Sequence, residues 1–265
     1  MPNETREPDI HDVREIRLEE KKPPFRVVEA VNALRGNIQL SGYNIKLIGI
    51  TSALMHEGKS TVALMLARSF AALDKRTLFI DCDIRNSYLI DRLDVQTRIT
   101  GLTEYLCSEL PLNEIIYDTS EKNLEIIFTG GKAPSPSELF SGERFKALLK
   151  TLREQYDYVI LDTAPVNAVI DGVLIAKECD GTVMVLESGV TDRAQIQHAI
   201  QQLKYAGVKL LGVVLNKLGS KKSGYGYGYG YGYGYGHGYG YGYGYGHEYG
   251  YGEDMESDGK KKNKR

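Results

Sequence analysis

"KLIGITSALMHEGKST", residues 46–61, is the stretch that decides the fold. A run of apolar residues leads into a short loop, and "GKST" opens a helical pattern that continues from Lys59 to about Leu73. A strand, a loop and a helix in this order are the context of a phosphate-binding P-loop. The loop departs from the usual pattern because Ala53 stands where the first glycine is expected. A chance Gly-Lys-Ser at a strand-to-helix junction is therefore the alternative interpretation.

A P-loop binds phosphate oxygens through backbone N–H groups and the N-terminal end of the following helix. Its lysine reaches the terminal phosphates, and the hydroxyl of the next residue binds Mg²⁺. We therefore expect ATP and Mg²⁺ as cofactors. The expected nucleotide-binding residues of the loop are Glu57, Gly58, Lys59, Ser60 and Thr61.

Apolar runs of strand length recur along the chain and alternate with helical patterns. The runs cover residues 46–52, 77–83, 124–130, 158–162, 181–187 and 209–216. Helical patterns cover residues 25–40, 59–73 and 136–155, the last as a single helix, and further helices begin near Asp171 and Thr191. Strands without polar alternation, separated by helices, indicate a parallel sheet that helices cover on both faces. The predicted fold class is α/β, with a doubly wound, mostly parallel sheet of the P-loop NTPase type over residues 25–219.

Composition limits what else the chain can be. The 265 residues carry a formal net charge of -2, which predicts no general affinity for nucleic acid. Three cysteines without paired or metal-type spacing are typical of a reducing cytoplasm. No run approaches the roughly 18 apolar residues that a membrane helix needs. We therefore expect any membrane association to come through a partner.

Two segments flank the predicted domain. Residues 1–24 form a charged N-terminal segment, and we expect residues 1–22 to be poorly ordered or a solvated helix. Residues 220–265 form a tail that we expect to be disordered, because glycine at all but one of the alternate positions of residues 225–251 opposes ordering. This Tyr cluster holds twelve of the nineteen tyrosines: Tyr225, Tyr227, Tyr229, Tyr231, Tyr233, Tyr235, Tyr239, Tyr241, Tyr243, Tyr245, Tyr249 and Tyr251.

Three aspartates follow strand-like runs, at the sheet edge where doubly wound folds bind their ligands. Asp81 and Asp83 end "LFIDCD", and their spacing of two places both on one side of an extended chain. Asp162 ends "VILD" and precedes Pro165, as in a Walker B element. Carboxylates beside bound phosphates suit Mg²⁺. A helix cap or a turn is the alternative role for each aspartate.

These motifs together resemble those of the bacterial tyrosine kinases (BY-kinases) of capsular and exopolysaccharide systems. "ITSALMHEGKST" is similar to their Walker A motif, "LFIDCDIR" to their Walker A′ motif and "VILDTAP" to their Walker B motif. "GGKAPSPSELFSGERF" looks like their Pro-rich loop and the helix after it, and the Tyr-rich tail also fits the family. The resemblance implies a protein-tyrosine kinase that transfers the γ-phosphoryl group of ATP to its own tail, in trans within an oligomer, and that regulates polysaccharide synthesis and export.

The resemblance also implies roles for single residues. The expected catalytic residues are Lys59, Asp81, Asp83 and Arg85, and the expected Mg²⁺ ligands are Ser60, Asp83 and Asp162. Asp81 would accept or orient the tyrosine proton. Arg85 would either stabilise phosphate or pair with a carboxylate, and the sequence does not decide between them. Asn216 in "GVVLNK" resembles an adenine-contacting residue.

Partners follow from the family as well. The family's self-association motif E-x-x-R-x-x-R is present as Glu29, Asn32 and Arg35, so Glu29 and Arg35 are expected in a ring-like homo-oligomer although the middle arginine is absent. Other expected partners are a membrane-protein activator, through its cytoplasmic tail, and a cognate tyrosine phosphatase. The expected location is the cytoplasm, at the inner face of the membrane when the activator is bound.

Two other functions stay open at this point. The first is a positioning ATPase of the kind that partitions DNA or division sites. Its signature lysine early in the loop is replaced here by residues 51–53, "TSA". The second is a catalytically weak scaffold whose Tyr/Gly tail is adhesive.

Overall fold

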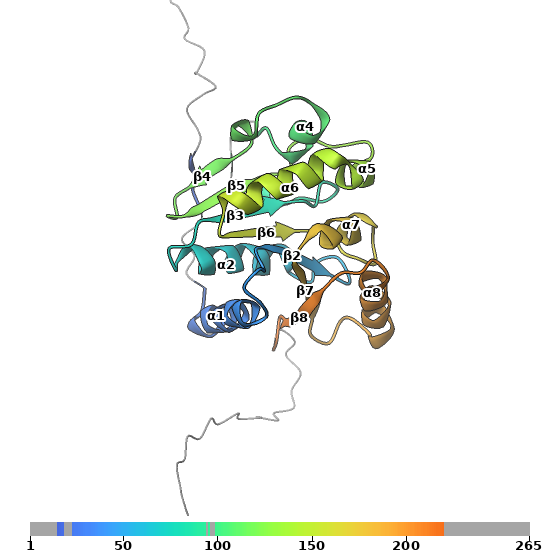
Figure 1. The fold of residues 1–265 in the computed structure, drawn as a ribbon. Helices are drawn as coiled ribbons and strands as arrows, with labels where there is room; N and C mark the ends of the chain where they lie inside the picture. The colour runs from blue at the N-terminus through green and yellow to red at the C-terminus, as the bar shows by residue number, and fades with distance from the viewer. Residues whose placement is uncertain (1–14, 19–22, 94, 96–98, 220–265) are drawn as a thin grey trace, which may run out of the picture. The chain divides into compact units, whose positions relative to one another are not determined.

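A sheet of eight strands lies at the centre of the computed structural model, which describes residues 15–18, 23–93, 95 and 99–219 (Figure 1). The strand order is β1-β4-β5-β3-β6-β2-β7-β8. Strands β5, β3, β6, β2, β7 and β8 run parallel, whereas β4 is antiparallel to β5. The predicted α/β fold with a mostly parallel sheet is therefore confirmed. The Tyr cluster, and with it the prediction of a disordered tail, lies outside the described residues.

The helices and strands alternate along most of the chain. The strands are β1 Glu15–Ile16, β2 Leu47–Ser52, β3 Thr77–Asp81, β4 Tyr117–Thr119, β5 Leu124–Ile127, β6 Tyr158–Asp162, β7 Gly181–Glu187 and β8 Leu210–Asn216. The α-helices are α1 Phe25–Leu40, α2 Lys59–Ala71, α3 Leu89–Arg92, α4 Leu102–Cys107, α5 Pro136–Ser141, α6 Glu143–Gln155, α7 Asp171–Glu178 and α8 Arg193–Tyr205. A 3₁₀-helix, η1, covers Leu112–Glu114.

Helices cover both faces of the sheet, as Figure 1 shows for α2 and α6. Side chains of successive strand residues point to opposite faces. In β3, Phe79 packs with α1 and α2, whereas Leu78 and Ile80 pack with α6. A third cluster joins α7 and α8 to β7. All six residues of β2 are buried, because this strand lies between β6 and β7 and under both helix layers.

The structure differs from the sequence prediction between Pro136 and Gln155. The predicted single helix is two helices, α5 and α6, which meet at Gly142. This glycine has φ -71° and ψ 153°, an extended conformation that interrupts the helical path. The predicted helix boundary was therefore wrong.

Two short strands were absent from the prediction: β1, at one edge of the sheet, and β4, next to it. Strand β1 lies in the segment that was expected to be poorly ordered or helical, and its Ile16 is buried in the core. Strand β4 pairs with β5 in the antiparallel direction. Within the described part of the chain, every helix is too short or too polar to cross a membrane.

Candidate active site at the carboxyl ends of the central strands

A cavity of about 410 Å³ opens where β2, β3 and β6 end. Its lining includes residues from the P-loop, from the segment after β3 and from the end of β6. The parallel strands all present their carboxyl ends at this edge, so motifs that are far apart in the sequence meet here. The cavity-lining residues among those predicted are Gly58, Lys59, Ser60, Thr61, Asp81, Asp83 and Asp162.

The P-loop turns sharply at Gly58, just before α2 begins at Lys59. Gly58 has φ +92°, a backbone conformation that residues with a Cβ atom rarely adopt. A Cβ atom at this position would lie 2.2 Å from Asn216 Nδ2. Asn216 Nδ2 donates a hydrogen bond of 2.9 Å to the carbonyl oxygen of Glu57. Asn216 therefore braces the P-loop from the end of β8, and it lies beside the predicted nucleotide site.

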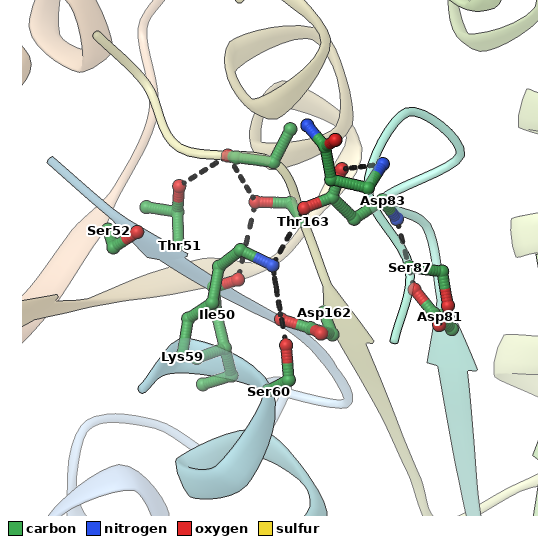
Figure 2. Close-up of polar contacts among 12 residues, drawn as sticks. Ile50, Thr51, Ser52, Lys59, Ser60, Asp81, Asp83, Ser87, Asp162 and Thr163 are labelled. Atoms are coloured by element: carbon green, nitrogen blue, oxygen red, sulfur yellow. Dashed lines mark hydrogen bonds and ion pairs between the residues drawn. The ribbon is translucent and has the colours of Figure 1, made fainter. Parts of the chain in front are cut away.

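Lys59 connects the P-loop to the two acidic motifs (Figure 2). Its Nζ atom lies 2.9 Å from Asp83 Oδ2 and 3.5 Å from Asp162 Oδ1, and only 9% of the residue is exposed. Burial lowers the pKa of Lys59, but the negative charges of Asp162 and Asp83 outweigh it and raise the pKa above its ordinary value. The ammonium group is therefore charged and sits against two carboxylates.

Asp81 lies beside this ion cluster and is only 2% exposed. Its Oδ1 accepts a 3.1 Å hydrogen bond from the Asp83 N–H, and its Oδ2 accepts one of 2.5 Å from Ser87 Oγ. Burial and the negative charge of Asp162 raise the pKa of Asp81 to about 7. Burial also raises the pKa of Asp162.

Arg85 is bound to a carboxylate in the structure. Its Nε donates to Asp171 Oδ2 at 2.6 Å, and its Nη2 donates to Asp171 Oδ1 at 3.3 Å. Asp171, the first residue of α7, has a side chain only 1% exposed. The carboxylate-pairing role that the sequence left open is therefore the one observed, and Arg85 ties the segment after β3 to α7.

The side chain of Glu57 is engaged inside the protein. Its carboxylate accepts hydrogen bonds from the N–H groups of Leu54 at 2.7 Å and Glu187 at 3.1 Å, and from the hydroxyl of Thr191. Glu57 can therefore face a nucleotide only through its backbone. The carboxylate fixes the start of the P-loop against the loop after β7, a role that the sequence did not indicate.

Other cavity residues were missed by the sequence reasoning. Lys217, directly after Asn216, donates from Nζ to the His56 carbonyl oxygen at 2.6 Å and to a Glu187 carboxylate oxygen at 2.7 Å. Arg92, in α3, donates to Thr61 Oγ1 at 2.8 Å. The lysine in "GVVLNK" is a weak signal in the sequence, and none marks Arg92.

The predicted oligomer residues lie away from this cavity, on α1. Arg35 Nη1 donates to the carbonyl oxygen and the hydroxyl of Ser69 on α2, at 2.8 and 2.6 Å. It also donates to Asn32 Oδ1, while Asn32 Nδ2 donates to Glu29. Arg35 is therefore bound within its own chain, and its role in an oligomer stays a prediction.

The donors at the cavity fit a nucleotide with its magnesium ion. Carboxylate and hydroxyl oxygens are the ligands that Mg²⁺ prefers, and it commonly uses one or two carboxylates together with substrate phosphates and water. Among the described residues, no group of three or more carboxylate, imidazole or thiolate side chains is arranged to hold a metal by itself. A site completed by phosphate oxygens agrees with this arrangement.

Comparisons with known proteins agree with the geometry. Residues 46–203, more than half of the chain, match the family described as AAA domain. The tyrosine-protein kinase CpsD of Streptococcus pneumoniae is 40% identical over 212 residues, which cover 79% of this chain and 93% of that protein. The kinase domain of the Escherichia coli tyrosine kinase ETK superposes with a TM-score of 0.70 and 30% identity, over 81% of this chain and 94% of that one.

A more distant structure is similar in fold alone. The septum site-determining protein MinD of Pyrococcus horikoshii, solved with Mg-ADP, has a TM-score of 0.57 and 22% identity over 67% of this chain and 72% of that one. The P-loop fold, the convergence of the three motifs and the kinase relatives lead to the same conclusion. The chain belongs to the bacterial tyrosine kinase family and is a tyrosine-protein kinase with a nucleotide-binding P-loop.

Proposed function

We propose that this chain is an ATP-dependent autokinase that phosphorylates the tyrosines of its own Tyr cluster, residues 225–251, in trans within an oligomer. Residues 25–219 would form the kinase domain. The observation that carries the proposal is the cavity in which Lys59, Asp83 and Asp162 form one ion cluster beside buried Asp81. The tyrosine kinase relatives give the acceptor its chemical class.

The residues of the cavity have different roles in the proposed phosphoryl transfer. Lys59 and the loop N–H groups would bind the phosphates, and Ser60, Asp83 and Asp162 would hold Mg²⁺. Mg²⁺ supplies neutralisation of the phosphate charge when it is bound. Lys59 Nζ lies beside the carboxylates of Asp83 and Asp162, so the group that would bind the phosphates is next to groups that would hold Mg²⁺.

Asp81 orients the acceptor. The phenol oxygen forms a bond to the γ-phosphorus, the bond to the leaving ADP oxygen breaks, and the phenol proton is released to the aspartate. A carboxylate with a pKa of about 7 is a weak base towards a phenol with a pKa of about 10. The proton therefore leaves late in the reaction, and Asp81 acts mainly by directing the phenol oxygen.

The length of the tail supports transfer between subunits. The glycine-alternating sequence predicts flexibility, and a flexible run of about 28 residues would have a root-mean-square span of roughly 30 Å, enough to sample a neighbouring active site. Each phosphate adds about -1.5 to -2 charges, so several phosphates oppose docking at an acidic cavity. The ring-like oligomer would loosen as the tail becomes anionic, and a tyrosine phosphatase would restore it.

We further propose a cellular role from the family resemblance. The kinase acts in the cytoplasm and is recruited to the inner face of the membrane by the cytoplasmic tail of a membrane-protein activator. It regulates capsular or exopolysaccharide synthesis and export. Addition of that tail should raise the rate of phosphotyrosine formation. An unchanged rate over a range of activator concentrations would contradict this partner.

The test of the proposed function uses the purified full chain with Mg-ATP and detection of phosphotyrosine. The chain should become phosphorylated, whereas Lys59→Met and a variant without residues 224–252 should not. Absence of phosphotyrosine from the unmodified chain under every condition, with and without activator, would overturn the proposal.

A positioning ATPase is the second candidate, and the similarity to MinD favours it at the level of fold. This function predicts ATP hydrolysis that DNA or lipid stimulates, without phosphotyrosine. Measurement of both products in the same reactions separates the two functions.

A further inference from the structure

Ser87 makes the shortest hydrogen bond to the carboxylate of Asp81. Asp81 is almost fully buried, and both of its oxygens accept hydrogen bonds from the segment that follows β3. The Asp83 N–H binds Oδ1 at 3.1 Å, and Ser87 Oγ binds Oδ2 at 2.5 Å. Figure 2 shows the Ser87 side chain pointing towards Asp81. The two contacts fix the plane of the carboxylate.

The neighbours of Ser87 determine the direction of its hydroxyl hydrogen. Ser87 Oγ accepts a 3.3 Å hydrogen bond from the Leu89 N–H. A serine hydroxyl has a single hydrogen to donate, and an ionised carboxylate can only accept. When Asp81 is ionised, the hydrogen of Ser87 therefore points at Asp81 Oδ2, and the hydroxyl is held from both sides.

Lys59 does not make the close contact to Asp81 that Ser87 makes. Lys59 Nζ makes its close contacts with Asp83 and Asp162, at 2.9 and 3.5 Å. Among the described residues, the hydrogen bonds that hold Asp81 come from Asp83 and Ser87. Both Ser87 and Asp81 also line the cavity that the acceptor must enter.

We propose that Ser87 is a positioning residue that aims the Asp81 carboxylate at the acceptor phenol. This inference rests on the proposed function. A carboxylate has about four lone-pair directions, of which Ser87 and the Asp83 N–H occupy two. The remaining directions are fixed in space, so an incoming phenol finds its acceptor oxygen already oriented. Small errors in the placement of a reacting group lower the rate strongly.

The test measures initial rates of phosphotyrosine formation on the full chain as a function of ATP concentration. Ser87→Ala should lower kcat by about 10- to 100-fold while the KM for ATP changes less than about twofold. Ser87→Thr keeps the hydroxyl and should recover most of the rate. Ser87→Cys, with a weak donor of similar size, should behave like Ser87→Ala. Ser108→Ala is the matched control, since this exposed hydroxyl bonds only within its own segment, to the Glu104 carbonyl oxygen at 2.7 Å.

Binding of ADP, measured by calorimetry, reports whether each variant keeps a folded nucleotide site. A kcat of Ser87→Ala equal to that of the unmodified chain overturns the inference while the proposed function stands. A loss of rate that appears in the KM for ATP, or that Ser87→Thr does not reverse, also overturns it, because Ser87 would then act on the nucleotide or on the fold. Absence of phosphotyrosine from the unmodified chain overturns the proposed function and this inference together.

Discussion

Replacement of Arg85 by alanine should destabilise the protein and leave ATP binding nearly unchanged. Arg85 pairs with Asp171 through two hydrogen bonds, of 2.6 and 3.3 Å, and the aspartate is almost completely buried. The variant leaves that carboxylate without its cation. The carboxylate must then take up a proton or draw in water, and either response reduces the free energy of unfolding.

The magnitude follows from the geometry. Two unit charges about 4 Å apart interact by about 4 kcal/mol at an effective dielectric constant of 20. The Arg85 side chain is 39% exposed, so solvent screens part of this energy, and desolvation of Asp171 offsets another part. We expect a net loss of about 1 to 3 kcal/mol, or a fall in Tm of roughly 2 to 10 °C for a domain of this size.

Urea unfolding followed by circular dichroism measures the stability, and calorimetry with ATP measures binding. Lys122→Ala is the matched control, because Lys122 pairs with Asp74 on the surface with both side chains about 80% exposed, 83% and 79%. The free energy of unfolding of this control variant should equal that of the unmodified chain within the error of the urea measurement. Unchanged stability of Arg85→Ala together with a large loss of ATP affinity would refute the reasoning and assign Arg85 to phosphate.

Three further predictions concern the P-loop and the cavity beside it. Gly58→Ala should weaken ATP binding at least about tenfold in calorimetry, because its Cβ would lie 2.2 Å from Asn216 Nδ2. Gly207 also has positive φ but open space around it, so Gly207→Ala should bind ATP normally, and equal ATP affinities of the two variants would contradict the steric argument. Glu57→Gln should lower the free energy of unfolding by about 1 to 3 kcal/mol in urea, since an amide cannot accept all of the hydrogen bonds of the carboxylate; no change would contradict its bracing role. Folded Asp81 binds its proton more tightly than the unfolded chain does, so without Mg²⁺ the free energy of unfolding should fall by up to about 4 kcal/mol as the pH rises from about 4 to 7. In thermal melts across this range, Asp81→Asn should show a smaller fall, and parallel curves for the two proteins would contradict the raised pKa.

The central strands could be predicted because burial on both faces requires continuous apolar runs. Residues 47–52, for example, lack any polar alternation and form the fully buried strand β2. Strand β1 at the edge of the sheet and its neighbour β4 have two and three residues, too few to show a period, so only tertiary pairing defines them. The break at Gly142 was missed because a single glycine also occurs inside a helix, as Gly36 does in α1, so the residue alone does not mark a helix end.

The site was predictable to the extent that it follows from topology. Parallel strands end at one edge, so Lys59 and the aspartates after β3 and β6 were expected to meet. The partner of Arg85 is 86 residues away, and the path of two loops decides which carboxylate it reaches. The contacts of Glu57 and Ser87 likewise depend on loop conformation, which residue spacing does not encode.

The most direct test of the central claim mixes two variants of the full chain. One carries Lys59→Met with an intact tail, and the other lacks residues 224–252 but keeps Lys59. With Mg-ATP, intact-mass spectrometry should find phosphate on the Tyr cluster of the Lys59→Met chain in the mixture and none on either variant alone. An unmodified Tyr cluster in that mixture, while the full chain alone becomes phosphorylated, would contradict transfer between subunits.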